Sequence, residues 1–218
     1  RIRWQQGDDV RVLLADEVTL DRVSLRALLD QQPRITVIGE ASTGREALSL
    51  ADAARPDLIV LHANLPELNG IDVAERLCRQ DRRCRVILTA RALQTKAVSR
   101  ALASGVDGVV LKEATMAEML SALATVMSGK RYLSPRIEQL LPASGDHEPA
   151  NGCEILTTRE REVLQLVAEG SIAKEIASVL GVSTKTVDAH RRRVMEKLQL
   201  GSIAELTRLA VREGLVRI

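Results

Sequence analysis

The chain has 218 residues, of which 45% are hydrophobic and 28% are charged, and this composition predicts one large or two small globular domains. Its formal net charge of +2 is close to neutral, so a nucleic-acid site must come from local clustering of cations. No apolar stretch approaches the roughly 18 residues that a membrane helix needs, and we expect no membrane partner. The three cysteines (Cys78, Cys84 and Cys153) are odd in number and lack metal-ligand spacing, which favours reduced thiols in a cytoplasmic protein.

Short β-branched runs alternate with helical patterns in the first part of the chain. The runs predict strands at residues 10–15, 35–40, 58–62, 85–89 and 108–112. The patterns that follow them predict helices at residues 20–29, 44–54, 71–80, 95–104 and 116–129. Five βα units in series are typical of a doubly wound α/β domain with a five-stranded parallel sheet, which we place at residues 9–130.

The remainder of the chain has a different character. Proline and glycine recur between residues 131 and 153, which predicts a linker with a short helix near its start. From residue 154 to 218 the pattern is purely helical, and Thr157 followed by Glu160 fits a capping box. Four short helices in this segment predict an all-α helix-turn-helix domain.

Polar side chains follow four of the predicted strands. In a doubly wound sheet, sites form at the carboxyl ends of the strands, so we expect these side chains to lie at one edge: Asp16, Glu17, His62, Thr89 and Lys112. Two carboxylates beside a hydroxyl and an ammonium group suit phosphoryl chemistry. Carboxylates hold a hard cation such as Mg²⁺, and the other two groups receive phosphate oxygens.

These residues resemble, one by one, the receiver domain of bacterial response regulators, over about residues 9–130. Asp16-Glu17 resembles its acidic pair, Thr89-Ala90 its switch pair and Lys112 its lysine. Leu65-Pro66 and Gly70 resemble the loop after its phosphoacceptor. The resemblance implies the flavodoxin-like receiver fold.

Two positions depart from the receiver pattern. His62 stands where the family has its phosphoaccepting aspartate, and Val109 stands at the switch position where the family has an aromatic residue. The first change removes the nucleophile and one Mg²⁺ ligand, because that ion prefers oxygen to imidazole nitrogen. We therefore do not expect His62 to be phosphorylated, and we expect Mg²⁺ binding to be weak or absent and no other cofactor to be needed.

Several interpretations of His62 remain open. It can simply fill the pocket, held by neighbours such as Asp16 and Glu17. Protonated, it can form an ion pair that imitates one signalling state and responds to pH. It can join Asp16 and Glu17 in a transition-metal site, or accept a phosphoryl group itself.

The helical end resembles the LuxR-type helix-turn-helix domain over about residues 154–216. The segments that carry this resemblance are Leu156–Leu164, Glu169-Gly170, Lys174–Ala177, Val182–Val187, His190, Val194, Lys197-Leu198 and Ala204–Leu206. Together with the receiver, it identifies the chain as a member of the NarL/FixJ class of response regulators.

A helix predicted from Thr184 to Leu198 would read DNA. Its core face is defined by the spacing of Val187, Val194 and Leu198, with Arg191 in part. By resemblance, the base-facing positions are Lys185, Asp188, Ala189 and Arg192. The expected phosphate contacts are Lys174, Thr184, Thr186, His190, Arg193 and Lys197. Asp188 is unusual on such a surface and can instead pair with Arg191 or Arg192.

The sequence thus predicts a cytoplasmic, sequence-specific transcription regulator that binds double-stranded DNA as a homodimer. By resemblance, the last helix supplies the dimer surface through Ile203, Leu206, Thr207 and Ala210, although Leu206 also fits the core. The alternative is a pseudo-receiver whose DNA binding is switched by a small ligand, pH or a protein partner such as a sensor kinase. An enzyme built on the acidic pocket is the least favoured hypothesis.

Overall fold

The computed structural model describes residues 9–80, 83–91, 93–141 and 152–216. The chain divides into two compact units. The first is an α/β unit, and residues 152–216 of the second form helices and their connections. None of the helices in the described ranges combines the length and the apolar character needed to cross a membrane.

A parallel sheet forms the centre of the first unit, with the strand order β2-β1-β3-β4-β5-β6. The strands are β1 (Val10–Ala15), β2 (Ile35–Ala41), β3 (Leu58–His62), β4 (Arg85–Ala90), β5 (Gly108–Leu111) and β6 (Tyr132–Leu133). The order of the strands reverses between β1 and β3, and the carboxyl ends of strands at such a point form the crevice where ligands bind in open α/β sheets.

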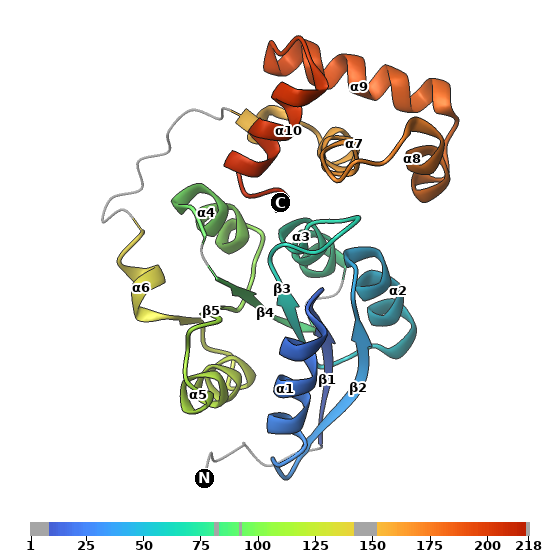
Figure 1. Ribbon diagram of the computed structural model, residues 1–218. Coiled ribbons are helices and arrows are strands. Elements are labelled where there is room, and N and C mark those ends of the chain that lie inside the picture. Colours follow the sequence, from blue (N-terminus) through green and yellow to red (C-terminus); the bar gives the residue numbers. More distant parts are fainter. Residues whose placement is uncertain (1–8, 81–82, 92, 142–151, 217–218) are drawn as a thin grey trace. The chain divides into compact units, whose positions relative to one another are not determined.

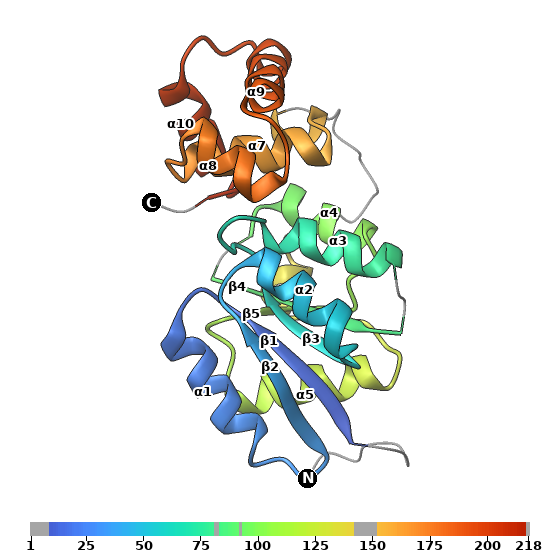
Figure 2. The ribbon, with the colours of Figure 1, turned by 90° about the vertical axis from the view of Figure 1, so that its right-hand side faces the viewer.

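Helices cover both faces of this sheet. They are α1 (Thr19–Leu29), α2 (Gly44–Ala54), α3 (Gly70–Gln80), α4 (Thr95–Ala103) and α5 (Met116–Met127). Helices α1 and α5 lie on one face, and α2, α3 and α4 lie on the other (Figures 1 and 2). On the α1/α5 side, alternate strand residues such as Val12, Val60 and Val110 pack with Leu29 and Leu123. The predicted doubly wound α/β fold is confirmed.

The sheet has one strand more than the sequence predicted. Tyr132 pairs with Gly108 and Leu133 with Val109, which adds the short edge strand β6 beside β5. Helix α6 (Pro135–Glu138) follows it, where the sequence predicted a short helix. Residues 132–138, in the first part of the linker predicted at 131–153, therefore contain regular structure and belong to the α/β unit. A two-residue strand is too short to give a periodic signal.

The second unit contains the four predicted helices, α7 (Thr158–Ala168), α8 (Ala173–Leu180), α9 (Thr184–Leu198) and α10 (Ile203–Arg212). A short 3₁₀ turn, η1 (Gly152–Ile155), precedes them and begins inside the predicted linker. The capping box is present: Glu160 N donates to Thr157 Oγ1 at 3.3 Å, and Thr157 N donates to Glu160 Oε2 at 2.8 Å. The turn between α8 and α9 begins at Gly181, whose φ of +64° favours a residue without a side chain.

Two apolar clusters hold these helices together. Val163, Ile176 and Val187 join α7, α8 and α9. Leu164, Val194 and Leu206 join α7, α9 and α10. Helix α9 contributes to both clusters, so its orientation within the unit is fixed from both sides.

Candidate functional site

Five polar residues that the sequence predicted at strand ends do lie at the carboxyl edge of the sheet. Asp16 and Glu17 follow β1, His62 ends β3, and Thr89 lies opposite it in β4. Lys112 follows β5, and its N–H donates to the carbonyl of Ala90 at 2.8 Å. Parallel strands end at the same edge, and this is why residues so far apart in the sequence meet there.

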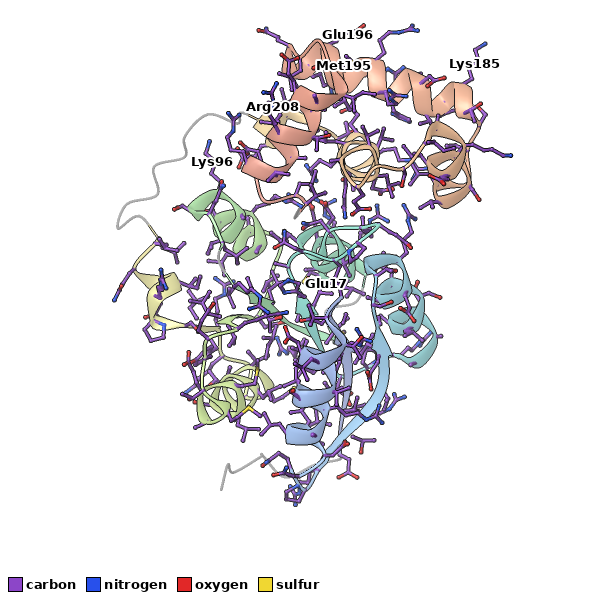
Figure 3. The ribbon with its side chains drawn as sticks, in the orientation of Figure 1. Glu17, Lys96, Lys185, Met195, Glu196 and Arg208 are labelled. Atoms are coloured by element: carbon purple, nitrogen blue, oxygen red, sulfur yellow. The ribbon has the colours of Figure 1, made fainter. Side chains whose placement is uncertain are left out.

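The His62 side chain is completely buried at this edge. Its Nδ1 lies 3.0 Å from the carbonyl oxygen of Thr89, which also accepts the N–H of Ala63 at 2.8 Å. A carbonyl oxygen only accepts hydrogen bonds, so Nδ1 carries the hydrogen. Nε2 lies 3.6 Å from Oε1 of Glu17, a side chain that is 28% exposed. Figure 3 shows Glu17 at this edge of the α/β unit.

Lys112 lies between two carboxylates. Its Nζ is 2.6 Å from Oδ2 of Asp16 and 2.7 Å from Oδ2 of Asp21. Arg91 adds a weaker contact, 3.5 Å from the same Asp21 oxygen. The hydrogen bond from Lys112, supported by the charges of Lys112 and Arg91, outweighs burial and holds the pKa of the Asp21 carboxyl below its usual value.

Asp21 was missed by the sequence reasoning, which considered only residues at strand ends. It lies in the first turn of α1, directly after the loop that carries Asp16 and Glu17. That position is the available signal: the amino end of a helix after a strand returns to the edge at which the strand ended. Acidic residues are common in the first turn of a helix, because they interact favourably with the helix dipole. From the sequence alone, Asp21 therefore does not indicate a functional site.

Backbone geometry is informative at two positions near this edge, Gly70 and Val109. A Cβ atom on Gly70 would lie 1.9 Å from the carbonyl oxygen of His62, so the loop between β3 and α3 can close only around glycine. Val109, at the predicted switch position, is fully buried in β5, and its carbonyl accepts the N–H of Ser134. Thr89 is 5% exposed.

Metal-ligand geometry is not found in the ranges that the structure describes, where no group of three or more His, Cys, Asp or Glu side chains is arranged to hold an ion. The three-ligand site considered for Asp16, Glu17 and His62 is therefore not formed in this structure.

The predicted DNA-reading helix, α9, has one buried and one exposed side. Val187 and Val194 are buried, whereas Lys185, Arg192 and Arg193 are exposed. Figure 3 shows Lys185 projecting near the start of α9 and Glu196 near its end. Ser183 caps the helix: its Oγ accepts the N–H of Thr186 at 3.1 Å and lies 2.8 Å from the Thr186 hydroxyl. The predicted core face is thus confirmed for both valines.

The other predicted DNA contacts differ in their surroundings. Lys174 and Thr184 are exposed, and Thr186, Ala189 and His190 are half-buried. Asp188 lies 3.7 Å from Arg191, so the helix pair considered from the sequence forms with Arg191.

Lys197 contacts an acid within its own unit. Its Nζ lies 2.7 Å from Oε2 of the buried Glu160, the same oxygen that closes the capping box of α7. Burial alone would raise the pKa of Glu160, but hydrogen bonds from Lys197 and Thr157 hold it below its usual value. The predicted phosphate contact of Lys197 stays a prediction, and in this structure the residue links α9 to α7.

The predicted dimer surface on α10 is divided between surface and core. Ile203 is 48% exposed and Thr207 is half-buried. Leu206 and Ala210 are buried in the unit's own core, as the sequence suggested for Leu206.

Both units are similar to known protein families. Residues 12–124 match the family model "Response regulator receiver domain", and residues 154–210 match "Bacterial regulatory proteins, luxR family". Response regulator GacA of Pseudomonas viridiflava is 31% identical over 209 residues, which cover 95% of this chain and 98% of GacA. The nitrate/nitrite response regulator protein NarL of Escherichia coli K12 is 33% identical over 197 residues, 89% of this chain and 91% of NarL.

A solved structure of two RcsB dimers bound to two parallel DNAs has a similar fold, with a TM-score of 0.60 and 22% identity over 94% of this chain and 99% of RcsB. The receiver model alone matches more than half of the chain, and the two curated relatives extend the similarity through the helical unit. The chain therefore belongs to the response regulators that combine a receiver domain with a LuxR-family regulatory domain.

Proposed function

We propose that this LuxR-family response regulator, a DNA-binding transcription regulator by its family, binds specific DNA sequences as a cytoplasmic homodimer, without control by aspartyl phosphorylation. The observation that carries the second part is His62. A buried imidazole lies at the end of β3, where the resemblance to receivers places the phosphoaccepting carboxylate. Its Nδ1 is engaged with the Thr89 carbonyl, so the side chain supports the sheet edge.

The surroundings of His62 also support weak or absent Mg²⁺ binding. Mg²⁺ requires oxygen ligands in near-octahedral geometry. Of the residues that would hold it, Asp16 already contacts the Lys112 ammonium at 2.6 Å, and His62 offers nitrogen in place of carboxylate oxygen. The residues present therefore do not fit the ion.

The exposed side of α9 supports DNA binding by the second unit. Lys185, Arg192 and Arg193 combine exposure with positive charge on one helix, opposite the buried valines. Such a cluster attracts DNA although the whole chain is almost neutral. We propose that base contacts come from Lys185, Asp188, Ala189 and Arg192, and phosphate contacts from Lys174, Thr184, Thr186, His190, Arg193 and Lys197.

Two observations support a homodimer: the small size of the helix-turn-helix unit and the dimers in a similar solved structure. One helix-turn-helix unit offers little interface for selective binding, so two copies on paired half-sites are expected. The similar RcsB structure contains dimers bound to DNA. On α10, the exposed Ile203 and the half-buried Thr207 remain accessible for such a contact.

The test uses the full chain and a phosphodonor mimic. Beryllofluoride with Mg²⁺ should change neither the melting temperature nor the affinity for promoter DNA, because the carboxylate that these reagents require is absent. The H62D variant serves as the positive control for the reagents. A Mg²⁺-dependent stabilisation of the unaltered chain, or a tighter complex with DNA, would overturn phosphorylation-independence.

A second candidate is favoured by the contact between His62 and Glu17. An imidazole 3.6 Å from a carboxylate gains attraction when it is protonated, which is the basis of many pH-sensitive contacts. In that case DNA affinity would change between about pH 5 and pH 8 in the unaltered chain, and H62Q would remove the change. A response that appears only after a metabolite or protein is added would point to a ligand or partner as the switch.

A further inference from the structure

The Lys112 ammonium group is held more firmly than a surface lysine. Its side chain is 11% exposed, and its two carboxylate contacts of 2.6 and 2.7 Å come from different segments, the end of β1 and the first turn of α1. A cation removed from water to this degree needs anions close by, because desolvation disfavours the charged form.

The chain lacks a carboxylate at the end of β3, where an acid would lie at the same edge of the sheet as Asp16. His62 occupies that place, and its Nδ1 carries a hydrogen toward Thr89, so the hydrogen-bonded side of the ring offers Lys112 no acceptor. Asp21 approaches the edge from α1 and supplies a second anion. Its carboxylate is also close to Arg91, which leaves two cations and two anions in this cluster.

We infer that Asp21 is a positioning residue that takes the place of the carboxylate missing at residue 62, and that together with Asp16 it fixes the Lys112 ammonium as a built-in cation of the pocket. The arrangement accounts for the poor fit of Mg²⁺: a positive charge already lies against Asp16. It also links the β5 end to α1, since Lys112 follows one and Asp21 belongs to the other. This inference rests on the proposed independence from phosphorylation.

The consequence is specific to one amine. Lys112 should react slowly with a small amine-directed reagent such as acetic anhydride, because its side chain is largely buried and its ammonium group lies between two carboxylates. In the D21N variant of the full chain, the reactivity of Lys112 should rise about three- to tenfold, in the range expected for loss of one partly buried ion pair. Exposed Lys130 and Lys185 should not change and provide the internal reference in the same mass-spectrometric measurement.

Two further variants separate positioning from general stability. D30N removes an exposed acid at the other end of α1, whose contact is with Arg26, and should leave Lys112 protected. In the H62D/D21N double variant a carboxylate returns to the end of β3, and Lys112 should regain most of its protection. A loss of helix packing alone would not be rescued in this way.

Unchanged Lys112 reactivity in D21N, or increased reactivity that H62D does not reverse, would overturn the inference. If all lysines of D21N react faster, the variant is unfolded, and D21E decides instead: it keeps the charge and should keep Lys112 protected, and failure to do so would also overturn the inference. These measurements use no phosphodonor and no DNA, so a phosphodonor response of the unaltered chain would be recognised separately as failure of the proposed function.

Discussion

Arg192 is exposed on α9, on the side away from the buried residues Val187 and Val194. A guanidinium group there can donate two parallel hydrogen bonds to a guanine edge. We expect Arg192→Ala to weaken specific DNA binding by about 1–3 kcal/mol and to relax the sequence preference at one base pair. Fluorescence anisotropy with a set of single-base variants of the site measures both effects.

The control for this substitution is Arg208→Ala. Arg208 is an exposed arginine of α10, and its replacement by alanine removes the same charge from the same unit (Figure 3). It should weaken binding to all sequences alike, if at all, because only long-range charge is lost. Equal losses for the two variants, without any change in base preference, would refute the base contact of Arg192.

Single residues also show where sequence reasoning was limited. His62 and Lys112 were predicted at the sheet edge because strand ends can be located from apolar runs. The Asp21 contact could not be predicted in this way, since it depends on how the first turn of α1 returns to the edge. The contact of Lys197 could not be predicted either. Sequence spacing places Lys197 on α9, but its pairing with Glu160, 37 residues earlier, follows from tertiary packing.

At the scale of elements, Glu160 joins two helices. It closes the capping box of α7 and accepts a hydrogen bond from Lys197 on α9, and its pKa is held low. A group whose pKa is depressed by folding stabilises the protein above its unfolded pKa, and this contribution is lost as the pH falls through the folded value. Glu160→Gln should therefore cost about 1–2 kcal/mol of stability near neutral pH.

The same substitution should have a smaller effect in acid, since the carboxyl of the unaltered chain becomes protonated as well once the pH falls below its lowered pKa. Urea unfolding followed by circular dichroism at several pH values measures the difference between the two proteins. Glu196→Gln is the matched control, because Glu196 is exposed on α9. A penalty for Glu160→Gln that stays constant from neutral to acidic pH would contradict the role of its charge.

The elements themselves were largely predictable, and the exceptions have a physical reason. The β-branched runs and amphipathic helices of the α/β unit gave the five long strands and their helices within a few residues. Strand β6 was assigned to the linker because two residues carry no period, and its pairing with Gly108 and Val109 depends on the neighbouring strand. The 3₁₀ turn at Gly152–Ile155 was missed because one turn likewise shows no amphipathic repeat.

For the molecule as a whole, charge is distributed unevenly along the chain. The overall formal charge is only +2, yet α9 exposes Lys185, Arg192 and Arg193 together. In the receiver pocket, by contrast, Lys112 and Arg91 are paired with Asp16 and Asp21. The cations at the sheet edge of the receiver, where we expect no phosphoryl group to bind, are thus neutralised by neighbouring carboxylates. The cations on α9, where we expect DNA to bind, stay exposed.

If the protein binds two half-sites as a homodimer, its affinity should depend on the distance between the half-sites. Half-sites whose centres are about one helical turn apart present the same face of the duplex to both reading helices. Inserting about five base pairs turns one half-site to the opposite face, so affinity should fall to that of DNA with a single half-site. Inserting about ten base pairs restores the face and should recover part of the affinity, limited by the added distance.

Titration of the full chain against these three spacings, with the stoichiometry determined by sedimentation, checks the prediction. Two copies per DNA are expected at the original spacing. The Ile203→Asp substitution places a charge at the exposed start of α10, on the proposed dimer surface. It should lower affinity at the original spacing and leave binding to a single half-site unchanged. Ala204→Asp places the same charge at the neighbouring exposed position and serves as the control. Equal affinity at all three spacings would show that each copy binds independently, and the dimer on DNA would have to be abandoned.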